Sequence, residues 1–133
     1  MESEGNRKVE GEGFDGKMND TRTRRVAFAD AKLLDAFNKL KSGKFEDKQL
    51  ALEIEAAIDY LWKNPSVGIK IARRLWPSEY VTVYGIDNLR KYDMRSGWRL
   101  LYTISGNSVE VVAILLEWLN HKNYERRFKY KSN

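Results

Sequence analysis

The segment from Val109 to Trp118 constrains the fold most strongly, because both faces of an extended chain over these residues are apolar. One face carries Val109, Val111, Ala113 and Leu115, and the other carries Val112, Ile114 and Leu116. A strand of this kind needs a covering layer on each side of its sheet. We therefore expect a central strand with other elements packed above and below it.

Two shorter strands are expected before this segment, at about Asn88 to Asp93 and Trp98 to Ile104. The sequences MRSG and SGN, which separate the three strands, are typical of turns. A four-residue loop at Met94 to Gly97 predicts the following register and faces. In this register Asp93 pairs with Trp98, Tyr92 with Arg99 and Arg90 with Leu101. Arg90, Tyr92 and Arg99 then share one face of the hairpin. The opposite face, toward the core, carries Trp98, Leu100, Tyr102 and Ile104.

The N-terminal half of the domain predicts one strand and two helices. RRVAFAD, Arg24 to Asp30, fits a strand, and Asp30 is placed to cap a helix that ends at Ser42-Gly43. A second helix is expected from Glu46 to Trp62, where apolar residues recur at helical spacing. A tight link between the two helices predicts an antiparallel hairpin.

Two segments show no clear apolar period. Between Ser66 and Asp87 we expect an irregular connector with short strand pieces, because Pro77 interrupts any regular element. Residues 1–23 hold four of the nine glycines and few large apolar side chains, which predicts a flexible tail. The remaining residues 24–133 are long enough for a single domain with its own core.

Composition excludes several classes of site. The chain has no cysteine and one histidine, His121, so disulfides, thiolate nucleophiles and multi-histidine metal sites are ruled out within one chain. The apolar run VVAILL is too short to span a bilayer, and the first residues of the sequence lack the apolar core that a secretory signal needs, so we expect neither feature. We expect a cytoplasmic protein that uses neither a metal nor a cofactor and makes no membrane contact.

The positive charge is confined to the C-terminal third of the chain. Residues 1–25 hold six basic and six acidic residues, and residues 26–88 hold nine of each. Residues 89–133 hold nine basic residues against four acidic ones, which accounts for the whole net charge of +5. Segregated charge of this kind predicts a polyanionic partner.

The second expected strand reads SGWRLLYTI, and HKNYERRF follows the last strand. With the order strand, two helices, meander, these residues resemble the RelE/ParE superfamily of toxins from bacterial and archaeal toxin-antitoxin systems, over about residues 24 to 130. The resemblance implies an α+β fold. In it, an N-terminal strand and a two-helix hairpin pack on a mainly antiparallel sheet, with a short C-terminal helix.

For the RelE-like branch, the resemblance implies an endoribonuclease that cuts mRNA in the ribosomal A site, by attack of a 2′-hydroxyl on the adjacent phosphate. By position, Arg99 matches the phosphate-binding arginine, Lys122 a second arginine, and Arg90 the first of two catalytic lysines. The second of these lysines falls on Tyr92, which leaves the general base unassigned. His121 is a candidate for that role, because imidazole exchanges protons near neutral pH.

The RNA-binding candidates are cationic or aromatic residues of the expected hairpin and C-terminal segment. They are Lys91, Tyr92, Arg95, Tyr124, Arg126, Arg127 and Phe128. Phe128 falls at the position where the family has a tyrosine that stacks on a base. Tyr124, nearby, is also placed to fill that role. The resemblance implies three partners, a cognate antitoxin, mRNA and the ribosome, for a protein that is a monomer or weak dimer when free.

Other interpretations stay open. Arg99 is equally placed for an ion pair with Asp93 or Glu117, and His121 for a structural role at a strand end. Glu117 reads as an exposed or paired carboxylate, and Lys122, Arg126 and Arg127 fit a solvated helix face. For the whole protein, the alternatives are a ParE-like toxin that inhibits DNA gyrase and a catalytically inactive nucleic-acid-binding member of the superfamily.

Overall fold

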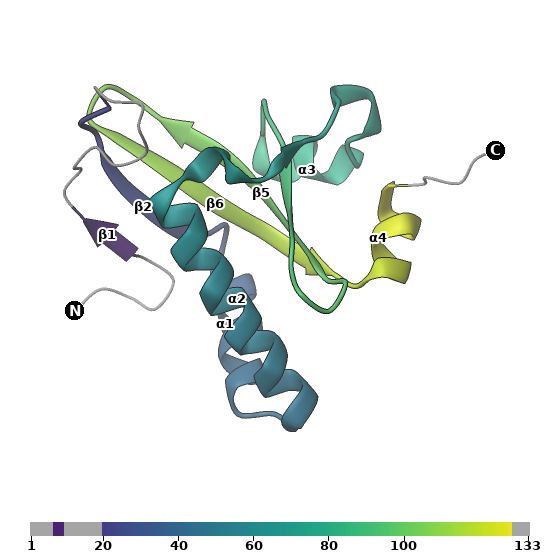
Figure 1. Cartoon of the computed structure of the whole chain (residues 1–133). Coiled ribbons are helices and arrows are strands. Elements are labelled where there is room, and N and C mark those ends of the chain that lie inside the picture. Colours follow the sequence, from purple (N-terminus) through teal and green to yellow (C-terminus); the bar gives the residue numbers. More distant parts are fainter. Residues whose placement is uncertain (1–6, 10–19, 129–133) are drawn as a thin grey trace.

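The computed structural model describes residues 7–9 and 20–128 and has an α+β fold (Figure 1). In chain order the elements are β1 (Arg7–Val9), β2 (Thr23–Phe28), α1 (Ala31–Lys41), α2 (Phe45–Lys63), the 3-10 turn η1 (Pro65–Val67), β3 (Ile69–Lys70), the 3-10 turn η2 (Arg73–Leu75), α3 (Ser78–Tyr84), β4 (Arg90–Asp93), β5 (Arg99–Gly106), β6 (Glu110–Leu119) and α4 (His121–Phe128).

The sheet has the strand order β1-β2-β6-β5-β4-β3. β2 and β6 run parallel, and the other neighbouring strands are antiparallel. β6 lies inside the sheet, and its side chains enter a separate apolar cluster on each face. The prediction of a central strand covered on both sides is therefore confirmed.

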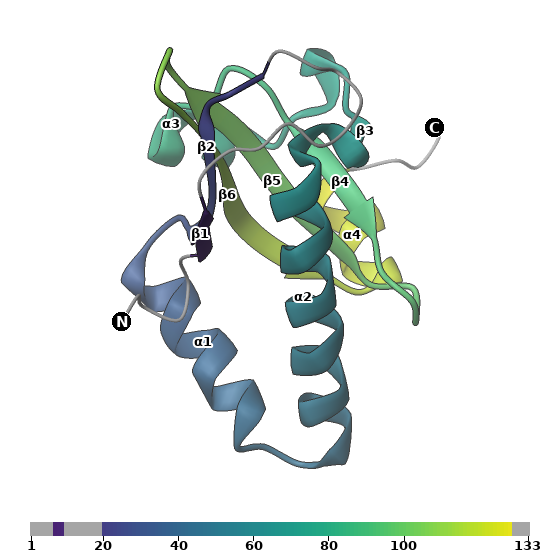
Figure 2. The same cartoon turned by 60° about the vertical axis from the view of Figure 1, so that its left-hand side comes forward.

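One face of the sheet is covered by the helical hairpin of α1 and α2 (Figure 2). The first apolar cluster joins Val26, Phe37, Ile54, Leu100 and Leu115, among others, each at most 2 % exposed. Asp30 caps α1 as expected, because its carboxylate accepts a hydrogen bond from the amide of Leu33 at 2.9 Å. The predicted helical hairpin is confirmed.

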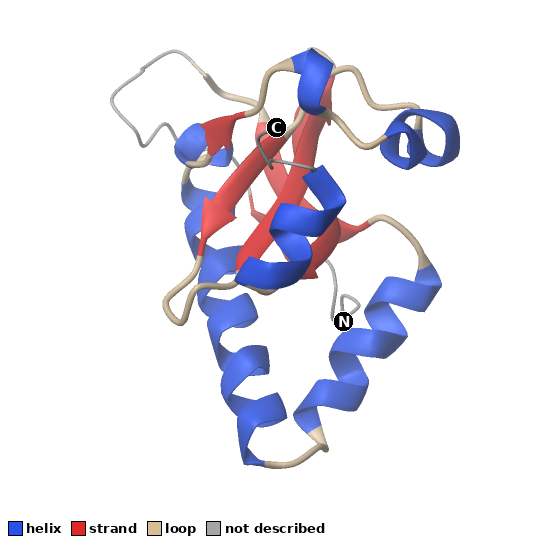
Figure 3. Cartoon of the chain, turned by 90° about the vertical axis from the view of Figure 1, so that its right-hand side faces the viewer, coloured by secondary structure: helices blue, strands red, loops and turns tan. Residues whose placement is uncertain are grey.

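The opposite face carries α3 and α4 (Figure 3). The second apolar cluster there includes Tyr80 of α3, Leu116 of β6, and Tyr124 and Phe128 of α4. The sequence interpretation missed α3. Pro77 stands just before its first turn, where a missing N–H breaks no helical hydrogen bond.

The register of the β4–β5 hairpin differs by one residue from the expected one. Asp93 pairs with Arg99, Tyr92 with Leu100, and Arg90 with Tyr102. The loop includes Trp98, whose carbonyl accepts a hydrogen bond from the Met94 amide at 2.7 Å.

This register separates the residues expected on one face. Because paired residues share a face, Arg90 and Tyr92 lie with Leu100 and Tyr102 on the α1–α2 side, and Arg99 lies on the α4 side. The prediction that Arg90, Tyr92 and Arg99 share a face is wrong. The core positions expected of Trp98, Leu100, Tyr102 and Ile104 are confirmed, since all four pack in the first cluster.

The predicted tail falls largely outside the described residues, which exclude 1–6 and 10–19. Three residues of it form β1, which pairs with β2 at the edge of the sheet. Within the part of the chain that the structure describes, no helix has the length and apolarity needed to cross a membrane.

A candidate nucleic-acid site between β5 and α4

Arg99, at the start of β5, is the centre of the candidate site. Its guanidinium lies 4.7 Å from the ring centre of Tyr124, and Nη1 donates to the Gly97 carbonyl at 3.1 Å. Nε has no hydrogen-bond partner and lies 3.6 Å from an Asp93 carboxylate oxygen. The side chain is 21 % exposed, so it is oriented by its neighbours and still reaches solvent.

His121, the first residue of α4, is the next member of the site. Its Nδ1 lies 3.2 Å from Arg99 Nη1, and because guanidinium only donates, Nδ1 is the acceptor. The ring proton of the neutral imidazole is then on Nε2, which lies 3.1 Å from the carboxylate of Glu125. The three side chains form a continuous hydrogen-bonded row along the surface.

Asp93 lies between two cations on this face. Its carboxylate accepts from Lys91 Nζ at 3.0 Å and faces Arg99 at 3.6 Å. The structural alternative for Arg99, an ion pair with Asp93, is therefore present. Asp93 is 52 % exposed, so an incoming phosphate can compete with it for both cations.

The aromatic residues of α4 are core residues. Tyr124 and Phe128 are 3 % and 4 % exposed, and their ring centres stack 4.6 Å apart. Neither ring has an open face on which a base could stack, so the stacking role implied by the resemblance has no exposed side chain in this structure. Lys122 and Arg126 are exposed, and Arg126 donates to the Asn123 side chain at 3.1 Å.

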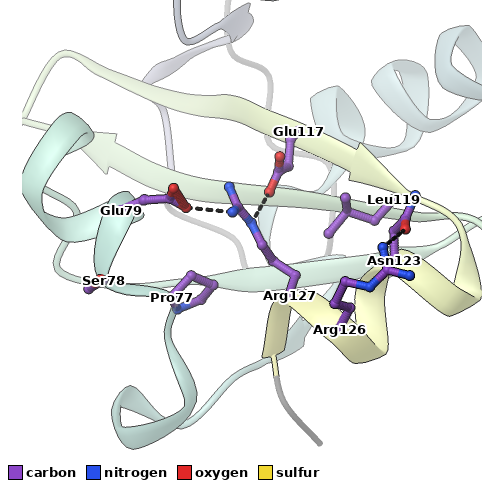
Figure 4. Close-up of a pocket in the computed structure, with 8 residues that line it drawn as sticks. All are labelled: Pro77, Ser78, Glu79, Glu117, Leu119, Asn123, Arg126 and Arg127. Atoms are coloured by element: carbon purple, nitrogen blue, oxygen red, sulfur yellow. Dashed lines mark hydrogen bonds and ion pairs between the residues drawn. The ribbon is translucent and has the colours of Figure 1, made fainter.

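Arg127 holds α4 against α3 and β6 (Figure 4). It donates to Glu117 at 2.9 Å and forms a second ion pair with Glu79 of α3. The Tyr80 hydroxyl also donates to Glu117, and burial together with the Glu117 charge raises the pKa of Tyr80, which keeps it a neutral donor. The expectation that Glu117 is a paired strand-end carboxylate is confirmed. We call this set of four residues the α4 clasp.

A cleft of about 490 Å³ opens beside the α4 clasp. Its lining residues come from α3 and the proline before it, from β6 and from α4: Pro77, Ser78, Glu79, Glu117, Leu119, Asn123, Arg126 and Arg127. Leu119 is the strand partner of Arg99, so the cleft begins next to the Arg99 site. Among the described residues, no group of three or more acidic or histidine side chains is placed to hold a metal ion.

Arg90 and Tyr92 lie away from this site, on the α1–α2 side of the sheet. Arg90 Nη1 donates to the carbonyls of Ser66 and Gly68, at 3.1 and 2.7 Å. Tyr92 packs against Tyr60 of α2, with ring centres 6.1 Å apart. Arg95 is exposed in the β4–β5 loop and lines a separate groove against α2.

The structure thus brings Lys91, Arg99, His121, Lys122 and Arg126 to one side of the sheet and separates Arg90, Tyr92 and Arg95 from them. Sequence reasoning missed Glu125 and Tyr80. The spacing of four residues between His121 and Glu125 is a signal for the first. Tyr80 gave no signal, because α3 itself was not predicted.

No protein-family model, curated protein or solved structure matches this chain.

Proposed function

We propose that this chain is a RelE-like toxin of a toxin-antitoxin pair, acting as a metal-independent endoribonuclease on mRNA in the ribosome. A cognate antitoxin, mRNA and the ribosome are the partners that this function entails. The order of elements supports it, since a strand, a helical hairpin, an antiparallel meander and a C-terminal helix follow one another as the resemblance implies. The observation that carries it is the 3.2 Å contact between Arg99 and His121 at a solvent-open edge.

The chemistry follows from this contact. A phosphate that binds the Arg99 guanidinium draws it away from His121, which frees Nδ1 to accept a proton. The substrate 2′-hydroxyl gives up that proton, its oxygen bonds to phosphorus, and the bond to the 5′-oxygen breaks. The products are a 2′,3′-cyclic phosphate and a 5′-hydroxyl, whose oxygen takes its proton from water. Arg99 and Lys122 stabilise the charge that develops on the phosphorane.

The first prediction tests Arg99. We expect Arg99→Ala to slow cleavage roughly 10²- to 10³-fold, by analogy with loss of an oxyanion-hole donor, and Arg99→Lys to be intermediate, since it keeps the charge and loses the planar fork. The measurement is primer extension on a translated mRNA with each purified variant. Lys48→Ala, an exposed cation on α2, is the control and should cut like the wild type.

Thermal melts accompany the assay, because Arg99 packs on Tyr124. We expect Arg99→Ala to cost about 1 kcal/mol or less of stability, as exposed ion pairs and cation–π contacts do. Wild-type cleavage by Arg99→Ala would refute its catalytic role.

One observation favours a second candidate, a nucleic-acid-binding member of the superfamily that does not cleave. Both aromatic rings of α4, Tyr124 and Phe128, are buried, so a substrate base has no exposed ring on that helix on which to stack. The same assay separates the two functions, since a protein that binds RNA and leaves the primer-extension pattern unchanged is a binder alone.

A further inference from the structure

The short segment from β3 to η2 carries three cations within five residues. Lys70, Arg73 and Arg74 are all exposed. Among the residues that the structure describes, no ion pair joins any of the three to an acidic side chain. In the Arg99 site and the α4 clasp, by contrast, the central cations are paired. The charge of these three residues is therefore available to a ligand.

The backbone that carries these cations is held in place. Lys70 pairs with Arg90 across the sheet, and the Ile71 amide donates to the Leu89 carbonyl at 2.9 Å. Trp76 Nε1 donates to the Ile71 carbonyl at 2.8 Å, which folds the chain back on itself. Three positive charges within five residues are thus presented on a fixed framework at the edge of the sheet.

The turn η2 of this segment lies on the side of the sheet that carries the Arg99 site. Leu75 and Trp76 pack against the apolar cluster that contains Tyr124 of α4, so η2 and α4 lie on the same side of the sheet (Figure 3). Ile69, next to Lys70, is the strand partner of Lys91. Lys70 is the strand partner of Arg90 and therefore lies on the α1–α2 side of the sheet, whereas Arg73 packs on Trp76, which belongs to the α4 side. The cations of this segment thus flank the edge strand β3, and Arg73 continues the face that carries Lys91 and Arg99.

We propose that Lys70, Arg73 and Arg74 form a second anchoring site for single-stranded RNA, which binds the phosphate backbone away from the scissile bond. This inference rests on the proposed function and adds a substrate contact to it. Phosphate contacts position a strand without reading its sequence, and exposed Lys and Arg on a rigid edge supply them. Arg73 lies 4.5 Å from the ring centre of Trp76, so an aromatic ring, a group on which bases stack, lies in the same segment.

RNA fits these features better than an acidic protein does. A phosphate strand needs only spaced charge that stays hydrated, which the exposed Lys70, Arg73 and Arg74 supply. Loss of binding to an acidic protein with RNA binding unchanged would assign the segment to a protein partner instead.

The test is binding of a fluorescently labelled 2′-O-methyl RNA single strand, which the proposed reaction cannot cut, at several salt concentrations. We compare the wild type with the triple variant Lys70→Ala, Arg73→Ala, Arg74→Ala. The matched control is Lys32→Ala, Lys39→Ala, Lys48→Ala, which removes the same charge from exposed positions on α1 and α2. Net charge is then equal in both variants, and only its place differs.

We expect the triple variant to lose at least about tenfold in affinity for the RNA. The slope of log affinity against log salt concentration should become shallower by roughly 2, since each phosphate contact on a single strand contributes roughly 0.7 to that slope. The control should lose much less. The double variant Arg73→Lys, Arg74→Lys keeps the charge and should keep most of the affinity. This result would show that the triple variant loses affinity through lost charge and not through misfolding. Equal losses in the triple variant and the control would overturn the second site. A wild type that binds no RNA would overturn it too, whereas the primer-extension assay on a translated mRNA decides the proposed function separately.

Discussion

Arg90 is held by two backbone carbonyls of the chain that leaves α2. Its guanidinium donates to Ser66 and Gly68, and the Tyr102 hydroxyl donates to the Pro65 carbonyl at 2.6 Å from the neighbouring strand. These bonds fasten the chain that leaves α2 onto the sheet. Gly68 is part of this contact, because a Cβ there would meet the Lys91 carbonyl at 2.6 Å.

We predict that Arg90→Ala lowers the free energy of unfolding by about 1.5–3 kcal/mol, since hydrogen bonds to charged groups contribute that much. RNA cleavage should be nearly unchanged, because Arg90 lies on the opposite face from Arg99. Urea denaturation measures the first effect and primer extension the second. Lys39→Ala, an exposed cation of α1, is the stability control. Loss of cleavage at unchanged stability would return Arg90 to the catalytic role that the resemblance implies.

The residues of the candidate site could be chosen from the sequence, but their faces could not. Arg99 and His121 were both named there, and they lie 3.2 Å apart. The face of Arg90 depends on whether the hairpin loop includes Trp98, which Gly97, at φ 85°, helps decide. A slip of one residue reverses every side chain of a strand, so the sequence pattern alone could not settle it.

At the scale of elements, α4 depends on the α4 clasp for its position. The helix is short, and a single helix of this length is not stable by itself in water. Tyr124 and Phe128 fix it to the sheet, and Arg127 fixes its last turn to Glu117 and Glu79. The placement of His121 beside Arg99 follows from these contacts.

We predict that Arg127→Ala costs about 1–3 kcal/mol of stability, because it leaves a half-buried carboxylate without its cation. Amide hydrogen exchange should become faster in His121 to Phe128, and RNA cleavage should fall as His121 loses its place. Arg126→Ala is the matched control, since it removes the same charge one residue earlier, from an exposed side chain. Equal exchange in the two variants would mean that aromatic packing alone holds α4.

The elements differed in how far the sequence could predict them. β6, α1 and α2 carry long apolar patterns, and all three are present. α3 has only seven residues and one buried side chain, Tyr80, so its periodicity is too short to detect. Its stability comes from Glu117 and from the second apolar cluster, both distant in sequence.

At the scale of the molecule, the sheet separates two apolar cores that are covered by elements of different length. The first is covered by two long helices, whereas the second is covered by short elements, α3, α4 and the turn η2. Both clusters are built from residues between Val26 and Phe128. β1 pairs three residues with β2 at the sheet edge.

The final prediction compares the two ends of the chain. Deleting residues 1–19 should change the free energy of unfolding by about 1 kcal/mol or less, the scale of changes outside a core. Truncation after Asn120 removes Tyr124 and Phe128, whose burial stabilises by about 1.5–3 kcal/mol each, and should unfold the second core first. Urea denaturation of both deletions against the full chain measures this.

Light scattering accompanies the denaturation, because loss of β1 exposes the edge of β2 to pairing with a second molecule. A stability loss from the N-terminal deletion as large as that from the C-terminal one would show that the N-terminal segment belongs to the folded core.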